Sequence, residues 1–282
     1  MTKGVLYVVA TPIGNLEDFS QRAAETLRQV DLIAAEDTRH TRLLLRHYAI
    51  DTPMRSLHEH NERVQMEPLI ERLLTGHSIA LVSDAGTPLI SDPGFPLVRQ
   101  VAAQGIRVVP IPGPSALICA LSAAGLPTDR FLFAGFPPRN SGQRKQWFEA
   151  LAPTQATLIF YESSHRILAS LQEMLTHFGA EREVVIAREM SKFHETFLRG
   201  NLVGLIDAVA GDENQQKGEF VVLVAAANPD GEARVEIDVE RLLRRLLLEL
   251  PLKKAVALTA EVTGSKKNRL YEQALKIKEE SM

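Results

Sequence analysis

Short apolar runs, glycine- or proline-bearing loops and helical patterns follow one another repeatedly through residue 228. This alternation is typical of α/β folds, in which helices cover a sheet. The expected strands are Val5–Ala10, Leu32–Ala35, Ile79–Ser83, Val108–Ile111, Phe131–Ala134, Thr157–Tyr161, Val184–Ala187 and Phe220–Ala225. Most of these runs are continuously apolar, which predicts central strands of parallel sheets.

Helix caps mark the segments between the expected strands. Ser20 is placed to cap a helix over Gln21–Val30. Glycines follow three further helical patterns and predict that these helices end there. Together with two further segments, the expected helices are Met66–Leu74, Leu97–Ala103, Ser115–Ala124, Gln143–Leu151 and Ile167–Phe178.

Two shifts in composition predict three parts of the chain. The first shift follows Gly125, and the second follows the turn sequence at residues 228–231, after which strand signals stop. We expect an α/β lobe over residues 1–125, a second α/β lobe over 126–228 and a helical module over 229–282. Two lobes of similar size suit a ligand held in the cleft between them.

Composition excludes several classes of protein. Lys and Arg number 32 against 35 Asp and Glu, so the chain is not basic from end to end and any nucleic-acid contact is local. The single cysteine, Cys119, excludes a disulfide framework and a zinc site made of cysteines. No apolar run reaches the length of a membrane span, and the opening run is too short for a signal peptide. We expect a protein of a reducing compartment, the cytoplasm.

Three loops at the ends of expected strands carry the strongest signal for a binding site. They are Thr11–Leu16, Ser83–Pro88 and Pro112–Ser115. In open α/β sheets ligands bind at the carboxyl ends of strands, where glycine lets a ligand approach the backbone. Any one of these loops is also an ordinary connection, but three together favour a ligand site.

We expect different roles for two aspartates in or near these loops. Asp84 ends a buried strand, where a carboxylate is costly unless a ligand group meets it. Asp92 lies in a similar turn eight residues later, and we expect it only to close that turn. The loops lack the glycine spacing of dinucleotide-binding and P-loop proteins. The residues themselves therefore predict a small, partly polar ligand between two lobes and do not name it.

The loop sequences resemble a known family. "ATPIGNLED", "AAEDTRHT", "SDAGTPLISDPG", "PIPGPSA", "FYESSHR", "AREMSKFHE" and "GEFVVLV" are similar to the tetrapyrrole methylase family of S-adenosylmethionine-dependent (class III) methyltransferases, and within it to a branch that modifies ribosomal RNA. The resemblance implies the two-lobed α/β fold of that family with a small helical module. It also implies 2′-O-methylation of cytidine 1402 of 16S rRNA in the small ribosomal subunit, by a homodimer without a membrane or metal site.

The family holds S-adenosylmethionine between its two lobes. Carried over to this chain, the cofactor lies against the segments Asp84–Ile90 and Pro114–Ala116 and against the strand from Gly218. The individual cofactor-binding residues are Pro12, Ile13, Asp84, Gly86, Thr87, Ile90, Pro114, Ser115, Ala116, Tyr161, Glu162 and Gly218. The first loop, Thr11–Leu16, departs from the glycine-richer loop that is common in porphyrin-modifying members.

Methyl transfer to a ribose hydroxyl needs positioning and removal of a proton. Lys192 either stabilises the developing alkoxide or acts as a base with a depressed pKa, and Glu189 and Glu195 are placed to orient it. The alternative is that these charged residues form a solvated loop without a role in catalysis. Asp37 and Arg39 follow another strand. Arg39 is placed to clamp a phosphate, while Asp37 holds either Arg39 or a base edge. The alternative is a plain surface ion pair between the two side chains.

Further basic residues are candidates for RNA binding. Arg166 lies at the start of an expected helix, a poor place for a cation unless it meets an anion such as phosphate. Seven basic residues between Lys253 and Lys278 face only two acidic ones. In the helical module the candidates are Lys253, Lys254, Lys266, Lys267 and Arg269. A helix over Ala255–Val262, stopped by Gly264 and followed by a helix capped by Ser265, resembles a helix-turn-helix reader. The alternative is a hairpin that covers the second lobe or joins two subunits.

The remaining candidates are weaker. His58 and His60 alternate as on one face of a strand and predict no metal site. Trp147, the only tryptophan, is expected to pack rather than to stack on a base. Two other functions stay open at this point: methylation of a small tetrapyrrole-like molecule, and a binding module without catalysis.

Overall fold

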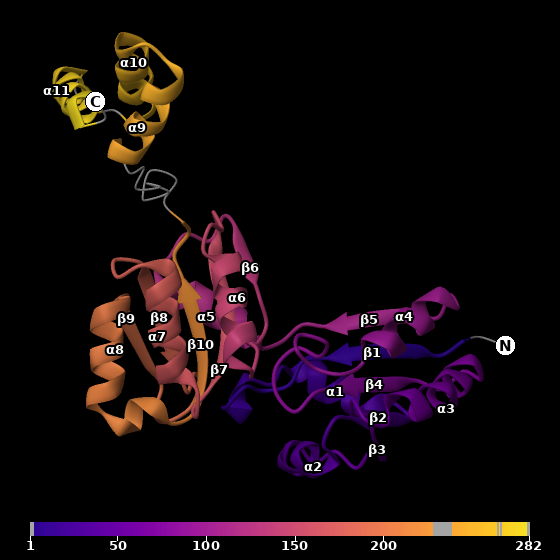
Figure 1. Cartoon of the computed structure of the whole chain (residues 1–282). Helices are drawn as coiled ribbons and strands as arrows, with labels where there is room; N and C mark the ends of the chain where they lie inside the picture. Colours follow the sequence, from indigo (N-terminus) through magenta and orange to yellow (C-terminus); the bar gives the residue numbers. More distant parts are fainter. Residues whose placement is uncertain (1–2, 228–238, 264, 266, 281–282) are drawn as a thin grey trace. The chain divides into compact units, whose positions relative to one another are not determined.

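The computed structural model describes residues 3–227, 239–263, 265 and 267–280, and of Arg241 and residues 278–280 it describes only the backbone. The chain divides into two compact units, Met1–Ala227 and Asn228–Met282. Figure 1 shows their ribbons, which we describe separately. The first unit contains two sheets and the second contains helices.

The first sheet is wholly parallel, as predicted. Its strands are β1 (Val5–Val9), β2 (Leu32–Ala35), β3 (Met54–Ser56), β4 (Ile79–Val82) and β5 (Arg107–Ile111), in the order β3-β2-β4-β1-β5. All carboxyl ends therefore meet at one edge of this sheet.

Helices cover both faces of the first sheet. These elements are η1 (Leu16–Asp18), α1 (Gln21–Gln29), α2 (Thr38–His47), α3 (Glu62–Leu74) and α4 (Phe95–Ala103). Leu27 of α1 and Leu44 of α2 pack with Ile33 on one face, while Leu73 and Leu97 of α3 and α4 pack on the other. Alternate strand residues point to opposite faces, so both are buried and the strands read as continuous apolar runs.

The second sheet is mostly antiparallel, so the expectation of parallel strands is wrong here. It comprises β6 (Phe131–Phe133), β7 (Thr157–Ser163), β8 (Glu183–Arg188), β9 (Thr196–Asn201) and β10 (Glu219–Val224), in the order β6-β7-β10-β8-β9. Only β6 and β7 run parallel. The seven residues between β8 and β9 are too few for a parallel crossover.

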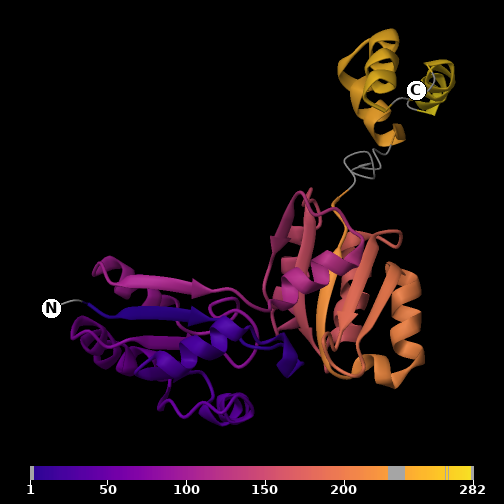
Figure 2. The same ribbon diagram turned by 180° about the vertical axis from the view of Figure 1, so that it is seen from behind.

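Helices also cover both faces of the second sheet, which explains its apolar strands. One face packs against α6 (Ser141–Leu151), α7 (Ile167–Phe178) and α8 (Leu202–Gly211), the last followed by η2 (Glu213–Gln216). The other face packs against α5 (Ala116–Ala124), which crosses it in Figure 2. An uninterrupted apolar run thus indicates that both faces of a strand are buried, but it does not indicate whether the strand is parallel or antiparallel to its neighbours.

Helix α5 follows the first sheet in sequence but packs on the second. Leu117 and Leu121 lie in one buried cluster with Ile159, Val221 and Leu223. The boundary predicted after residue 125 stays a prediction, and α5, which precedes it, contributes its apolar side to the second sheet.

The described residues of the second unit form a bundle of three helices, as the pattern after residue 239 predicts. They are α9 (Val239–Glu249), α10 (Leu252–Thr263) and α11 (Lys267–Glu280). Leu243, Val256 and Leu270, one from each helix, meet in its small apolar core. Gly264 and Lys266 lie outside the described residues.

Other local expectations had mixed outcomes. Ser20 caps α1 and accepts a hydrogen bond from the backbone N–H of Ala23 at 3.1 Å, as predicted. Trp147 packs against Phe148 and Phe160, so its expected packing role is confirmed. His58 and His60 lie in the turn beyond β3 and not on a strand, so that expectation is wrong. No helix in the described part of the chain is long and apolar enough to cross a membrane.

Candidate active site

The three predicted loops are tied together at the carboxyl edge of the first sheet. Thr11 and Gly86 exchange backbone hydrogen bonds of 2.8 and 3.0 Å, which join the loops after β1 and β4. The hydroxyl of Thr87 donates to the carbonyl of Pro114 at 3.0 Å and links the loop after β5. A Cβ on Gly113 would lie 2.9 Å from Cβ of Ala10, so glycine permits this close approach.

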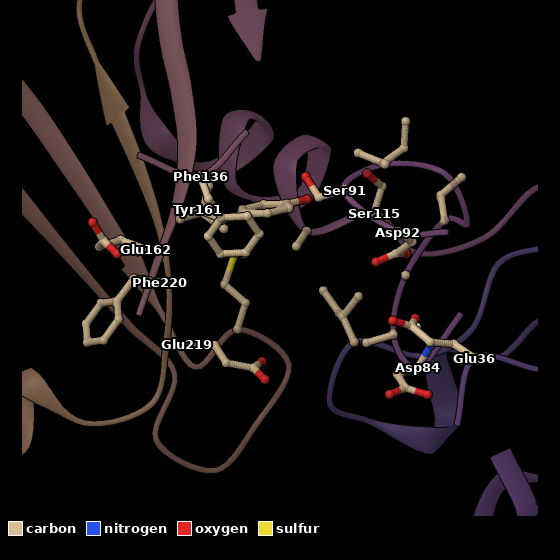
Figure 3. A pocket seen from close by; sticks show the side chains of 18 residues that line it. Glu36, Asp84, Ser91, Asp92, Ser115, Phe136, Tyr161, Glu162, Glu219 and Phe220 are labelled. Atoms are coloured by element: carbon tan, nitrogen blue, oxygen red, sulfur yellow. Dashed lines mark hydrogen bonds between the residues drawn. The ribbon is translucent and has the colours of Figure 1, made fainter. Parts of the chain in front are cut away.

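These loops form one side of a cavity of about 300 Å³, and residues of the second sheet form the other side. Figure 3 shows Glu36, Asp84 and Asp92 facing Tyr161 and Glu219 across it. The rings of Phe136 and Tyr161, whose centroids are 5.4 Å apart, give the cavity an aromatic wall. The predicted cleft between the two sheets therefore exists within the first unit.

Most of the predicted cofactor-binding residues line this cavity. They are Ile13, Asp84, Gly86, Thr87, Ile90, Ser115, Ala116, Tyr161 and Glu162. Pro12, Pro114 and Gly218 are not among its lining residues. The sequence analysis missed the lining residues Glu36, Ser91, Asp92, Phe136 and Met190, whereas Ala85, Glu219, Phe220 and Val221 lie in the segments expected to contact the cofactor. Glu219 follows Gly218 directly in the quoted "GEFVVLV" segment, which was the signal available for it.

The expectations for Asp84 and Asp92 are reversed in the structure. Asp84 is exposed and accepts a hydrogen bond from the backbone N–H of Asp37 at 3.0 Å. Asp92 is the carboxylate with the more buried environment, and burial raises its pKa to about 6, aided by the charges of Glu36 and Asp84. Burial also raises the pKa of Glu36. Asp92 therefore faces the cavity and does not merely close a turn, and its negative charge there costs folding free energy.

Glu162 lines the cavity, but its carboxylate is held by its own lobe. The side chain is fully buried and forms an ion pair with Arg166 at 2.8 Å. Its other partners are the hydroxyl of Ser170 at 2.5 Å and the backbone N–H of Ser163 at 2.7 Å. The anion that Arg166 meets at the start of α7 is thus Glu162, so the argument that Arg166 needs an external phosphate is wrong.

Lys192 is held by two carboxylates at the rim of the cavity. Its Nζ lies 2.9 Å from Oε1 of Glu189 and 2.9 Å from Oε2 of Glu219. Glu195 was also expected to orient Lys192, but it accepts the backbone N–H of Ser191 at 2.7 Å. The predicted pair of Lys192 and Glu189 is confirmed as a contact, and Glu219 takes the place expected for Glu195.

The charge state of Lys192 follows from these contacts. Partial burial alone would lower the pKa of Lys192, but the hydrogen bonds and charges of Glu219 and Glu189 outweigh burial and raise it. The same contacts outweigh burial at Glu189 and lower the pKa of its carboxyl. Lys192 is therefore an ammonium ion at neutral pH, and a depressed pKa, as a base would need, is contradicted.

The structure explains why residue 218 is a glycine, which the resemblance alone did not. Its φ is +101°, and a Cβ there would lie 2.5 Å from Cγ of Glu189. The space lets Oε1 of Glu189 accept the backbone N–H of Glu219 at 2.9 Å. Gly218 thereby makes room for the carboxylate that holds Lys192.

Asp37 and Arg39 form a compact pair at the start of α2. Asp37 accepts the backbone N–H of Arg39 at 2.8 Å as the cap of this helix, and their side chains pair at 2.6 Å. The side-chain bond to Arg39 holds the pKa of Asp37 well below its usual range. The Arg39 side chain is 87% exposed, so its unpaired face is open to a phosphate.

The basic residues of the second unit lie on its surface. Lys253 and Lys254 fall in the first turn of α10, and Lys267 and Arg269 in the first turn of α11; all four are exposed. Neither of these turns carries an acidic residue. Lys266, the fifth predicted residue, lies outside the described residues.

Comparisons with known proteins decide the family. Residues 5–205 match the family described as Tetrapyrrole (Corrin/Porphyrin) Methylases. The chain belongs to the tetrapyrrole methylase family. Residues 233–278 of this methylase match a family described as RsmI C-terminal HTH domain.

Full-length relatives carry one name. The chain is 56% identical over 276 residues to "Ribosomal RNA small subunit methyltransferase I" of Pseudomonas aeruginosa, with 98% of each chain covered. It is 53% identical to the protein of that name from Escherichia coli O157:H7, with 97% of this chain and 96% of that chain covered.

Solved structures show the same fold at low identity. Diphthine synthase aligns with a TM-score of 0.59 at 14% identity, over 79% of this chain and 90% of its own. A uroporphyrin-III-C-methyltransferase from Thermus thermophilus aligns with a TM-score of 0.57 at 19% identity, over 79% and 94%. The predicted two-lobed methylase fold is confirmed.

The cavity fits S-adenosylmethionine, the methyl donor of this methylase family. The cofactor carries a sulfonium and an ammonium group, and three carboxylates face the cavity from the first lobe: Glu36, Asp84 and Asp92. In the part of the chain that the structure describes, no Lys or Arg forms an ion pair with these three. A cationic ligand would relieve their mutual repulsion.

Proposed function

We propose that this methylase transfers a methyl group from S-adenosylmethionine to the ribose 2′-oxygen of cytidine 1402 in 16S rRNA, within the small ribosomal subunit. The observation that supports this most strongly is the full-length similarity to proteins named as small-subunit rRNA methyltransferases. The acidic and aromatic cavity supports the cofactor, and the basic helix starts of the second unit support an RNA substrate.

The cofactor, when bound, supplies an electrophilic methyl group. Glu36, Asp84 and Asp92 would hold its positive charges, and the rings of Phe136 and Tyr161 would pack against its apolar parts. The bonds between the three loops fix this side of the cavity before any ligand arrives. Methyl transfer is an in-line displacement, so fixed positions lower the barrier.

Lys192 stabilises the oxygen that attacks. The nucleophilic ribose oxygen gains negative charge as its proton leaves, and a preorganised ammonium next to it favours that change. Glu189 and Glu219 hold the ammonium in place at 2.9 Å each. In this proposal the proton leaves to water or to a nearby carboxylate, and Lys192 stays protonated throughout.

RNA phosphates are held by exposed arginine and lysine side chains. Arg39 offers a guanidinium already oriented by Asp37, which suits bidentate contact with a phosphate. In the second unit, Lys253, Lys254 and Lys267 lie where the helix dipole disfavours cations unless an anion is near. Phosphate at these helix starts removes that conflict.

The proposal includes a homodimer in the cytoplasm, with no membrane partner. Large apolar side chains remain exposed in the first unit, among them Ile118 on α5, and Phe131 and Leu132 on β6, an edge strand of the second sheet. Exposed apolar groups of this kind favour a contact with another protein surface. Sedimentation of the purified chain tests the dimer.

The deciding experiment is methyl transfer to its natural substrate. Labelled S-adenosylmethionine is incubated with the protein and small subunits from cells that lack it, and the RNA is digested to nucleosides. The proposal expects label on the ribose of one cytidine, mapped to position 1402. Label on a base or at another nucleotide contradicts the target, and no transfer to subunits contradicts the proposed substrate.

A further inference from the structure

Phe193 is the most exposed large apolar side chain in the described part of the chain. It is 96% exposed, against 73% for Leu248 and Val64, the next in order. It lies at the tip of the 189–195 loop, which joins β8 to β9. Phenylalanine is usually buried, so a ring left wholly in water suggests a function.

Hydrogen bonds hold the 189–195 loop in place, so the exposure of the Phe193 ring is not explained by a loosely held loop. The backbone N–H of Glu195 donates to the carbonyl of Lys192 at 3.1 Å, and Arg188 donates to the carbonyl of His194 at 3.1 Å. The hydroxyl of Ser191 also bonds to the carboxylate of Asp18, beyond the loop. These bonds hold the residues on both sides of Phe193.

Two residues of the loop adopt backbone conformations that side chains disfavour. Glu189 has a φ of 50° and Ser191 a φ of 67°. Such residues persist where the surrounding structure determines them, and they cluster at functional sites. Here they turn the chain so that Met190 points to the cavity while Phe193 is exposed.

The loop places Phe193 beside the reaction site. Met190 lines the cofactor cavity, and Lys192 pairs with Glu219, which lines it too. Phe193 follows Lys192 in the chain, and its ring packs edge-on against His194 at 5.0 Å between centroids. An exposed ring beside a fixed cation suits an unpaired nucleobase, which stacks on aromatic side chains while its backbone is drawn to positive charge.

The surroundings of Phe193 favour a base over a protein partner. Its neighbours in the loop, Ser191, Lys192, His194 and Glu195, are polar. The exposed apolar patches that mark protein interfaces are contiguous, whereas one isolated ring is sufficient to stack on one base.

We propose that Phe193 is a stacking platform for a nucleobase of the RNA substrate and so positions the adjoining ribose near Lys192. This inference rests on the proposed function and adds a substrate-binding residue to it. Phe193 is a positioning residue, because its ring acts on the substrate without taking part in bond changes.

Four variants test the ring. Phe193→Ala removes it, Phe193→Leu keeps an apolar side chain without a π face, and Phe193→Tyr restores the π face. Phe95→Ala removes a second exposed phenylalanine, 62% exposed at the start of α4, and serves as the control. Methyl transfer to unmodified small subunits is measured for each, together with affinity for S-adenosylmethionine, oligomeric state and salt dependence.

Loss of stacking should appear in the KM for subunits. Base–aromatic stacking contributes enough that its loss weakens binding by about tenfold or more. We expect this rise in KM for Phe193→Ala and Phe193→Leu, but not for Phe193→Tyr or Phe95→Ala. Cofactor affinity should be unchanged, and so should the slope of binding against salt concentration, because the ring carries no charge.

A fluorescent variant gives a second readout. Trp147 is the only tryptophan of the chain and packs against Phe148 and Phe160, so Phe193→Trp adds one exposed reporter. Unmodified subunits should quench the added signal, while the wild-type signal changes little.

Two results overturn the inference alone while wild-type methyl transfer stands. One is an unchanged KM in Phe193→Ala together with an unquenched Phe193→Trp. The other is full rescue by Phe193→Leu with an altered oligomeric state in Phe193→Ala, which would make Phe193 a contact between subunits. Absence of methyl transfer by the wild-type protein would instead overturn the proposed function, and the inference with it.

Discussion

The aliphatic stem of Lys192 lies directly over the backbone of Gly14: a Cβ at residue 14 would be 2.6 Å from Cγ of Lys192 and 3.0 Å from the carbonyl of Met190. Gly14 belongs to the loop after β1 and Lys192 to the loop after β8. The two lobes therefore touch at the residue proposed to stabilise the alkoxide, and the touching surface has no room for a side chain.

Gly14→Ala should lower methyl transfer by displacing Lys192. The added methyl group meets the carbonyl of Met190 as well as a flexible side chain, so the 189–195 loop must shift. A displacement of about 1 Å can reduce a rate by about a hundredfold. Steady-state kinetics with subunits test this. Gly211→Ala is the control, because no atom lies within 4 Å of the new Cβ, and it should keep the wild-type rate. Equal rates in both variants would show that Gly14 does not determine the position of Lys192.

Lys192→Met should reduce kcat by about a hundredfold or more, with affinity for S-adenosylmethionine nearly intact. The matched variant Lys145→Met removes an exposed lysine from α6 and should be neutral. Wild-type kcat in Lys192→Met would show that the Lys192 ammonium has no part in the reaction.

The pH profile distinguishes an ammonium from a base at Lys192. Because Glu219 and Glu189 raise the pKa of Lys192, this group keeps its charge from pH 7 to pH 9. Its contribution to folding is likewise present through this range and is lost only as the pH rises through its raised pKa. We expect no titration of kcat that disappears in Lys192→Met. A rise of wild-type kcat with pH that is absent from this variant would make Lys192 the base.

Asp92→Asn should stabilise the protein at neutral pH and weaken cofactor binding. The pKa of Asp92 is raised to about 6, so the folded state binds a proton that the unfolded state has already lost above about pH 4. Stability therefore falls as the pH rises from about 4 to 6, and the asparagine removes this fall. Above pH 6 we expect a gain of about 1–2 kcal/mol after allowing for solvent screening.

Thermal or urea unfolding between pH 4 and pH 8 measures the effect of Asp92→Asn, and titration with S-adenosylmethionine measures affinity. Asp207→Asn, an exposed substitution on α8, is the control and should change neither. A variant that is less stable than the wild type at pH 7 would show that the Asp92 carboxylate is compensated by contacts within the protein.

Arg166→Met should destabilise the first unit. It leaves the buried carboxylate of Glu162 without its cation, at a cost of about 2–4 kcal/mol. Arg39→Met removes an exposed ion pair and should change stability little. Melting temperatures of both variants provide the comparison. An unchanged melting temperature for Arg166→Met, with a smaller salt dependence of RNA binding, would support the original expectation that Arg166 contacts phosphate.

Deletion of residues 232–282 should spare cofactor binding, because every residue that lines the cavity lies in the first unit. Association with small subunits should weaken, and its dependence on salt should become shallower as phosphate contacts are lost. Binding measured at several salt concentrations tests both points. Full methylation by the truncated chain with the same salt slope would assign the helical module a structural role only.

Local sequence signals predicted the parts of the fold that depend on local chemistry. The cap at Ser20 and the glycine after α7 mark helix ends because they satisfy nearby backbone groups. Strands buried on both faces were recognised from apolar runs. The two missed strands, β3 and β9, lie at sheet edges, where partial exposure admits polar residues and removes the run.

The candidate site was predicted where backbone shape carries the signal and missed where distant side chains meet. The loops around Gly86 and Ser115 show in the sequence because their turns need particular residues. The pairing of Lys192 with Glu219 joins residues 27 positions apart, and the burial of Asp92 depends on Glu36 and Asp84. Neither relationship has a local pattern, so tertiary contacts alone reveal them.

The packing of α5 has a consequence for synthesis of the chain. Leu117 and Leu121 leave the ribosome about a hundred residues before Val221 and Leu223, which complete the buried cluster that they share with Ile159. At about 5–20 residues per second, this apolar helix waits roughly 5–20 s for its partner strand. All strands of the first sheet have been synthesised by then, so the nascent chain carries a complete first sheet followed by a helix with an exposed apolar side. Chaperones that bind exposed apolar segments have their best opportunity during this interval.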